Sequence, residues 1–284
     1  MLLQKTDSCI SENINNCSEI TIKRIRRNVI EQGKRLGNIG MHFGPTLSLV
    51  EILCALYFNV MKYKVENPDW EGRDRLILSK GHGVLAQYLV MKEVGFLKEY
   101  DINTFKNDFS VLSAHPSRHP ELGIDFSSGS LGQGLSLGVG VALALKKKFE
   151  NSPKVFVILG DGELDEGSVW EAVMAGAKFG LDNLVVIVDK NSLQYDGQTS
   201  DIMDIDPLNK KFEDFNWNVI DVDGHDLKAL TEGLQIFHSK PLCVIAHTVK
   251  GKGISFMENA AEWHNRALTQ DLYDKAIREF GEKE

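Results

Sequence analysis

Two polar turns, each placed directly after an apolar segment, carry oxygen atoms of the kind that a divalent cation prefers. Asp161 lies in a Gly-Asp-Gly turn after the apolar run 155–159, and Asn191 follows the apolar run 184–188. Asp161, the amide oxygen of Asn191 and the backbone carbonyl of Leu193 would supply three of the six oxygens that Mg²⁺ takes. A bound diphosphate and one water would supply the rest, because a carboxylate can lie beside a polyanion only with a cation between them.

The same residues also fit an ordinary surface structure. The Gly-Asp-Gly sequence could be a plain turn between a strand and a helix, and Asn191 could belong to a surface turn that runs to Tyr195, Asp196 and Gly197. The spacing favours the metal site, because about 30 positions separate Asp161 from Asn191. That distance leaves room for one crossover helix, so both side chains would follow consecutive strands of one sheet.

Four histidines lie in Gly-rich or polar segments where a role in the core is not expected: His42 in MHFGPTLS, His82 in SKGHG, His115 in LSAHPSRHP and His264 in EWHNRA. A loop histidine is more often a surface residue than a catalyst, but a neutral imidazole near pH 7 is suited to moving protons. The segment KGKG at 250–253 could bind phosphate, and on its own composition we interpret it as a solvated turn.

The elements that would position these residues alternate between strands and helices. A helix is predicted over 18–36, and Ser48 with Glu51 resembles a capping box at the start of a second, buried helix. Apolar runs at 76–78, 155–159, 184–188, 219–222 and 242–246 predict buried strands. This pattern predicts an α/β fold with a mostly parallel, twisted sheet and helices on both faces, where ligands bind beyond the carboxyl ends of the strands.

Composition limits the classes of function. The chain has 284 residues, is 43% hydrophobic, and carries a formal net charge of -8, which argues against binding nucleic acid through its overall field. Four scattered cysteines and no long apolar segment indicate a cytoplasmic protein without a membrane span. We predict a polar tail or arm over 1–17 and one domain over 18–284.

The segment GDGELDEGSVWEAVMAGAKFGLDNLVVIVDKNSLQYDG (160–197) resembles the thiamine diphosphate signature of transketolases, notably at Glu166 and at Asp196-Gly197. The resemblance extends from about residue 18 to about residue 280 and implies the thiamine diphosphate-binding fold, with Mg²⁺, or Ca²⁺ or Mn²⁺ in its place, on Asp161, Asn191 and Leu193. It implies that the cofactor is lined by His82, Gly129, Ser130, Leu131, Gly160, Asp161, Gly162, Glu163, Glu166, Asn191 and His264. The helix after SSGSLGQG (127–134), with Gly138 and Gly140, would pack against a neighbouring subunit.

The same resemblance implies that His42, His115 and His264 handle protons and contact the sugar, and that His82 contacts the diphosphate. It also implies that the loop 250–253 lies near the cofactor and folds over the site before His264. Three family glycines are replaced here, by Met41, Ala114 and Asn265. His119 lies close enough in the sequence to compete for the role of His115.

The chain matches only the diphosphate-binding half of full-length transketolases. We therefore expect the N-terminal subunit of a split transketolase, active with a separately encoded pyrimidine-binding partner in an α2β2 assembly and acting on small sugars or sugar phosphates. It would transfer a two-carbon ketol unit from a ketose to an aldose. Three alternatives stay open: ketol transfer to an unusual acceptor such as a nucleotide-linked sugar, the α subunit of a 2-oxo acid dehydrogenase, and a binding module without catalysis.

Overall fold

Parallel strands form the sheet of the computed structural model, which describes residues 17–236 and 238–281. The strands are β1 (Arg75–Leu78), β2 (Val155–Gly160), β3 (Leu184–Lys190), β4 (Asn218–Asp223) and β5 (Leu242–His247). Their order across the sheet is β1-β2-β3-β5-β4, and every neighbouring pair is parallel. The predicted strands and the predicted parallel sheet are therefore confirmed.

The alternation of side chains along the strands divides the core into two clusters. Phe156 and Ile158 belong to one cluster, whereas Val155, Val157 and Leu159 belong to the other, on the opposite face of β2. Because both faces are covered, β2 and β3 are apolar almost throughout. The predicted buried strand 219–222 is the edge strand β4, which is only partly buried.

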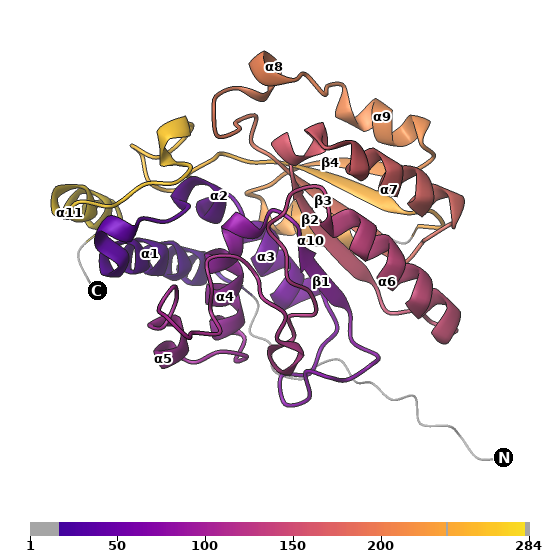
Figure 1. The fold of residues 1–284 in the computed structure, drawn as a ribbon, viewed down its shortest axis with the longest axis horizontal. Coiled ribbons are helices and arrows are strands. Elements are labelled where there is room, and N and C mark those ends of the chain that lie inside the picture. The colour runs from indigo at the N-terminus through magenta and orange to yellow at the C-terminus, as the bar shows by residue number, and fades with distance from the viewer. Residues whose placement is uncertain (1–16, 237, 282–284) are drawn as a thin grey trace.

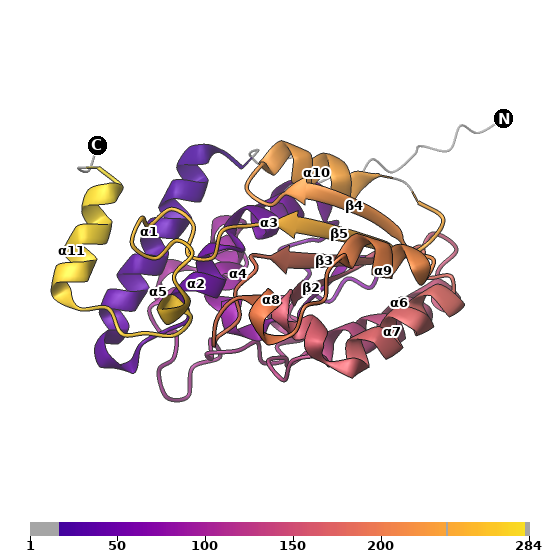
Figure 2. The same cartoon turned by 90° about the horizontal axis from the view of Figure 1, so that it is seen from above.

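Helices cover both faces of the sheet (Figures 1 and 2). One face is covered by α6 (Gly134–Lys148), α7 (Gly167–Lys178) and α9 (Leu208–Asp214). The other carries α1 (Glu19–Leu36), α3 (Val50–Cys54), α4 (Val84–Glu93) and α10 (Leu227–Gln235). The remaining α-helices are α2 (Phe43–Leu47), α5 (Glu99–Ile102), α8 (Thr199–Ile202) and α11 (Gln270–Glu279). No helix within the described ranges is long and apolar enough to cross a membrane.

The first helix begins and ends as the sequence predicts. Ser18 caps α1 by accepting a hydrogen bond from the Thr21 backbone N–H at 3.2 Å, and Gly37 ends it with a φ of 54°. The predicted tail over 1–17 lies outside the described residues apart from Cys17, whose side chain is buried.

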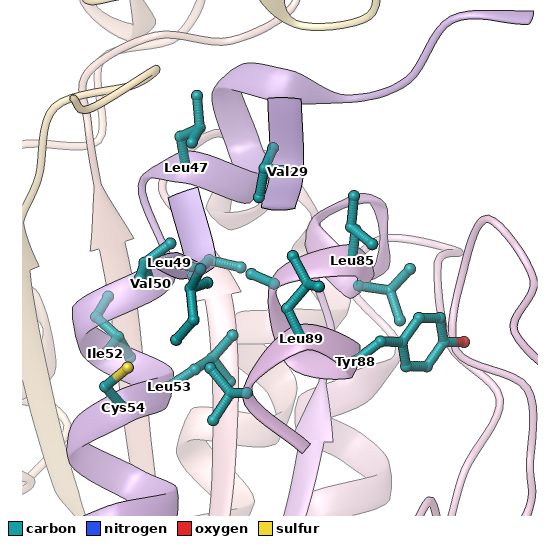
Figure 3. Close-up of a cluster of buried hydrophobic side chains, with 14 of the residues drawn as sticks. Val29, Leu47, Leu49, Val50, Ile52, Leu53, Cys54, Leu85, Tyr88 and Leu89 are labelled. Atoms are coloured by element: carbon teal, nitrogen blue, oxygen red, sulfur yellow. The ribbon is translucent and has the colours of Figure 1, made fainter. Parts of the chain in front are cut away.

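The second predicted helix is buried, but its predicted capping box is wrong. The chain runs through α2 and α3 with a break at Ser48 and Leu49, and Figure 3 shows Leu49, Ile52 and Leu53 among the buried apolar side chains. Ser48 donates its hydroxyl to Asp189 at 2.6 Å, and Glu51 binds Arg26 and His225. Tertiary contacts have taken both side chains away from local capping.

Two glycines of α6 give a matched test of how closely this helix packs against β2. A Cβ on Gly138 would lie 2.5 Å from Val157 of β2, whereas a Cβ on Gly140 would meet nothing within 4 Å. We expect Gly138→Ala to destabilise the chain by about 1–3 kcal/mol, as overpacking of a core does. Gly140→Ala should be neutral or stabilise by up to about 1 kcal/mol, since alanine is the better helix former.

Chemical denaturation of the two variants beside the unsubstituted chain measures the difference. A Gly138→Ala variant as stable as the Gly140→Ala variant would contradict the close contact between α6 and β2.

Candidate active site

The four loop histidines singled out in the sequence form one cluster. The ring centroid of His42 lies 5.6 Å from that of His82, 5.8 Å from that of His115 and 5.6 Å from that of His264. The rings of His82 and His264 are stacked at 5.1 Å. His42 is therefore the centre of a group whose members come from four separate segments of the chain.

Backbone contacts fix the segments that carry this cluster. Met41 and Arg266 exchange two hydrogen bonds of 3.1 Å, which join the His42 turn to the segment after His264. Gly129 has a φ of 125°, and a Cβ there would lie 2.8 Å from the His115 ring. Met41, which replaces a family glycine, is thus buried in a backbone bridge, and its side chain is only 2% exposed.

Burial makes these histidines neutral. It lowers the pKa of His42 to about 4, with the positive charge that His115 and Lys106 can place nearby as lesser causes. Burial, followed by the charge of Lys250, lowers the pKa of His264 to about 3. The pKa values of His82 and His115 are also lowered, in both cases chiefly by burial. Neutral imidazoles can accept protons and hydrogen bonds from a polar ligand.

His115 rather than His119 lies in the cluster. The His119 ring instead bonds Glu121 at 2.8 Å, and the His119 backbone bridges to Ile124. The structure thus separates two histidines that the sequence alone leaves in competition.

Asp161 and the segment 191–193 meet at the carboxyl ends of β2 and β3. The Ser192 backbone N–H donates to one Asp161 oxygen, and the Gly162 N–H donates to the other at 2.9 Å. Asn191 lies beside them, with its amide oxygen accepting from the Leu193 N–H at 3.2 Å. The structure therefore places the Asp161 carboxylate against the segment that carries the other two predicted metal ligands, Asn191 and Leu193.

The carboxylate of Asp161 is buried near another carboxylate, which makes its negative charge unfavourable. The residue is 3% exposed, and burial, then the charge of Asp189, raises its pKa to about 6. Its hydrogen bonds come only from backbone N–H groups among the described residues. A cation beside Asp161 would stabilise its buried negative charge, so the site fits a divalent metal.

Few carboxylates are available for such a metal. Among the residues described, no group of three or more His, Cys, Asp or Glu side chains is arranged to hold an ion. The donor set of one carboxylate, one amide and one carbonyl suits Mg²⁺, which is usually held by one or two carboxylates together with the phosphates of a ligand.

Glu163 makes its contacts inside the protein. Its carboxylate accepts hydrogen bonds from the Ser79 hydroxyl and from the backbone N–H groups of Gly132 at 2.9 Å and Gly160 at 3.2 Å. It thereby joins the turns that follow β1 and β2 to the Gly-rich turn before α6. Of the other residues that the resemblance assigns to the cofactor, Ser130, Leu131 and Glu166 are exposed, and Gly162 packs against Gln194.

A buried ion pair lies under the site. Lys80, in the turn after β1, donates to Asp189 at the end of β3, and their side chains are 2% and 0% exposed. Ser48 and Thr248 also donate to Asp189. In the sequence, the signal for Lys80 as a site residue is its position after a strand and two residues before His82.

The buried position of Lys250 differs from the solvated turn that the composition of the segment 250–253 predicts. The predicted solvated turn is wrong at this residue, which is 2% exposed and points inward. Its ammonium group donates to the carbonyl oxygens of Leu193 at 2.8 Å and Gln194 at 3.0 Å, and lies 3.1 Å from His264 Nδ1. Burial, followed by the charge of Lys80, lowers the pKa of Lys250 to about 8.

Comparisons with known proteins match most of this chain. The family described as transketolase, thiamine diphosphate binding domain, matches residues 19–284. An apulose-4-phosphate transketolase subunit from Actinobacillus succinogenes is 40% identical over 260 residues, 91% of this chain and 94% of that protein. The 6-deoxy-6-sulfo-D-fructose transketolase subunit from Clostridium sp. is 39% identical over 264 residues, covering 92% and 94%.

A solved structure has a similar fold within a longer chain. Transketolase from Leishmania mexicana superposes with a TM-score of 0.84 and 29% identity over 94% of this chain. This chain spans 42% of the length of that transketolase.

The buried charge of Asp161 predicts a pH-dependent effect of Asp161→Asn on the ligand-free chain. Because the folded state binds a proton at Asp161 more tightly than the unfolded state does, the free energy of unfolding falls as the pH rises from about 4 through about 6. We expect Asp161→Asn to be more stable than the parent at pH 8 by up to about 3 kcal/mol, and the advantage to vanish near pH 4.

Denaturant unfolding in the absence of divalent ions, from pH 4 to pH 8, measures this difference. A variant that is less stable than the parent at pH 8 would show that the backbone hydrogen bonds outweigh the buried charge.

Proposed function

This chain belongs to the transketolase family, as its thiamine diphosphate-binding domain, and from that membership we propose that it is the diphosphate-binding subunit of a two-component transketolase. The reaction would move a two-carbon ketol unit from a ketose to an aldose. The observation that carries the proposal is the buried Asp161 carboxylate, which lies beside Asn191 at the carboxyl edge of the sheet and lacks a cationic hydrogen-bond partner among the described residues.

Mg²⁺ would be held by Asp161, the Asn191 amide and the Leu193 carbonyl, and the diphosphate of the cofactor would meet Lys80, Lys250 and His82 nearby. When bound, thiamine diphosphate supplies the electron sink for breaking a carbon–carbon bond. The protein supplies charge, orientation and proton acceptors.

Lys250 and a metal would compete for one oxygen. The Leu193 carbonyl accepts the Lys250 ammonium here, and two cations on one carbonyl repel each other. We propose that Lys250 releases Leu193 when the metal binds and turns its charge towards the diphosphate. The same movement would separate Lys250 from His264.

His42, His115 and His264 would bind the sugar hydroxyls and accept protons from them. Their lowered pKa values keep all three neutral at pH 7, which a proton acceptor requires. His42, at the centre of the cluster, lies within one ring contact of the other two.

A second, separately encoded chain is part of the proposal. Relatives of similar length are named as single subunits of a transketolase, and the transketolase from Leishmania mexicana is more than twice as long as this chain.

Large apolar side chains are exposed on and beside α6 and α7, namely Leu131 (36%), Leu137 (37%), Met174 (49%) and Phe179 (50%). Such a surface suits a protein partner, and we propose an α2β2 complex in the cytoplasm.

The sugar substrate is open within the family. The relatives are named for apulose 4-phosphate and for 6-deoxy-6-sulfo-D-fructose, two different ketoses that each carry an anionic group. This variety supports the specialised ketol transfer that the sequence leaves open, whereas the family match favours transketolase over a 2-oxo acid dehydrogenase.

The test combines this chain with a candidate pyrimidine-binding subunit. Ketol transfer to ribose 5-phosphate is followed from xylulose 5-phosphate, apulose 4-phosphate and 6-deoxy-6-sulfo-D-fructose, with and without thiamine diphosphate and Mg²⁺. We expect turnover of at least one donor only in the complete mixture. Cofactor binding without turnover of any donor would move the search to other sugars, such as nucleotide-linked acceptors.

Asp161→Ala tests the metal ligand directly. We expect it to weaken Mg²⁺-dependent binding of thiamine diphosphate by about 100-fold or more, because one of few metal ligands is lost. Asp201→Ala, which removes an exposed carboxylate at α8, is the control and should bind normally. Equal affinity of the two variants would refute the assignment of Asp161, and absence of binding in every sample would favour a non-catalytic module.

A further inference from the structure

A buried network of Arg26, Glu51 and His225 lies outside the histidine cluster. One guanidinium nitrogen of Arg26 (Nη2) donates to both Glu51 oxygens, at 2.6 and 2.7 Å, and His225 Nδ1 lies 3.1 Å from Glu51 Oε2. The three residues come from α1, α3 and the turn between β4 and α10. None of them contacts Asp161, Asn191 or a histidine of the cluster through a side-chain hydrogen bond in the described chain.

Both ends of the Arg26–Glu51–His225 network hold the segment after β5. The Val249 backbone N–H donates to His225 Nε2 at 2.8 Å, and Arg26 Nε donates to the Lys252 carbonyl at 3.0 Å. These two contacts lie on either side of Lys250. The backbone is therefore fixed immediately before and shortly after the residue whose side chain enters the candidate active site.

Glycines let this segment approach its supports closely. Gly251 donates its N–H to the Gly44 carbonyl at 3.2 Å, and a Cβ on Gly44 would lie 2.9 Å from the Lys250 side chain. Gly253 has a φ of 90°, and a Cβ there would lie 2.7 Å from Arg26. The contact of Arg26 with Lys252 thus needs Gly253, and the contact of Lys250 with α2 needs Gly44.

The hydrogen bonds fix the state of the His225 ring. A peptide N–H can only donate, so Nε2 accepts from Val249 and the ring hydrogen is on Nδ1, from which it is donated to Glu51. Although burial opposes its charge, Glu51 keeps a lowered pKa through the His225 hydrogen bond and the charge of Arg26. An ionised Glu51 can thus orient both neighbours at once.

We propose that Arg26, Glu51 and His225 are positioning residues that hold the turn 249–252 so that the Lys250 ammonium enters the candidate active site. There it contacts the Leu193 and Gln194 carbonyls and His264. A lysine side chain has many rotamers, so its direction depends on a fixed backbone. The placement of Lys250 stands on these contacts alone; its service to a diphosphate rests on the proposed function.

His225→Ala tests the placement without any ligand. It removes the acceptor of Val249, and we expect an amine reagent to label Lys250 about threefold to tenfold faster, the range that one hydrogen bond is worth. Reductive methylation of the full-length chain, followed by peptide mass spectrometry, gives the rate for each lysine. Lys80 is the internal control, because Asp189 holds it and its side chain makes no hydrogen bond to residues 249–252 in the described chain.

A matched variant and a second substitution complete this experiment. His247→Ala removes an exposed histidine near the same turn and should leave the Lys250 rate unchanged. Among the described residues, the His247 ring bonds only Asp221. Glu51→Gln keeps the shape of the side chain but removes its charge, and should accelerate Lys250 as His225→Ala does. Equal acceleration of Lys80 and Lys250, or no change at Lys250, would overturn the proposal.

The consequence for cofactor binding is tested in the complex with the partner subunit. We expect His225→Ala to raise the Kd for thiamine diphosphate in Mg²⁺ by about tenfold, as loss of a supporting contact commonly does. In a Lys250→Met background the same substitution should have no further effect, because both changes act through Lys250. Additive effects would show that His225 acts elsewhere. If the parent complex does not bind the cofactor, the proposed function fails, whereas the labelling rates still decide the placement of Lys250.

Discussion

The rest of the site depends on the hydrogen bonds that the buried carboxylate of Asp189 accepts. Burial alone would raise its pKa, yet Lys80, Ser48 and Thr248 hold it below its ordinary value. Those donors belong to the turn after β1, the break between α2 and α3, and the segment after β5, and Asn191 also reaches Asp189 at 3.4 Å. A buried carboxylate needs partners, so this requirement draws four segments to one edge of the sheet.

The buried carboxylates near that edge differ in whether a cationic side chain lies beside them. Asp189 has a buried lysine, and Glu51 has Arg26, whereas Asp161 has only backbone donors within the described structure. The neighbouring histidines are held neutral by their burial and by the nearby cations. A polyanion with a divalent cation would balance Asp161 and Lys250 together, which is why a metal–diphosphate ligand explains more of the site than a metal alone.

Much of this arrangement could be predicted because its signals are local. The apolar runs predict every strand, and polar residues directly after a strand mark the turns that carry His82, Asp161 and Asn191. Other features have no local signal. Ser48 and Glu51 have the spacing of a capping box, but contacts with residues more than a hundred positions away, Asp189 and His225, determine what they do. Lys250 looks solvated from the composition of its segment, and only the family resemblance indicates that this loop folds over the site.

The sequence by itself therefore determined the α/β class, the parallel sheet, the family resemblance and the residue types available for chemistry, since periodicity, turn composition and motif spacing are properties of short segments. Only the tertiary structure decided the contacts between distant segments that have no local signal. It placed His115 and not His119 beside His42, used Glu163 to join turns inside the protein, and turned Lys250 inward. The physical reason is that burial and pairing of charges depend on neighbours distant in the chain, and these neighbours exist only after the strands have been ordered in the sheet.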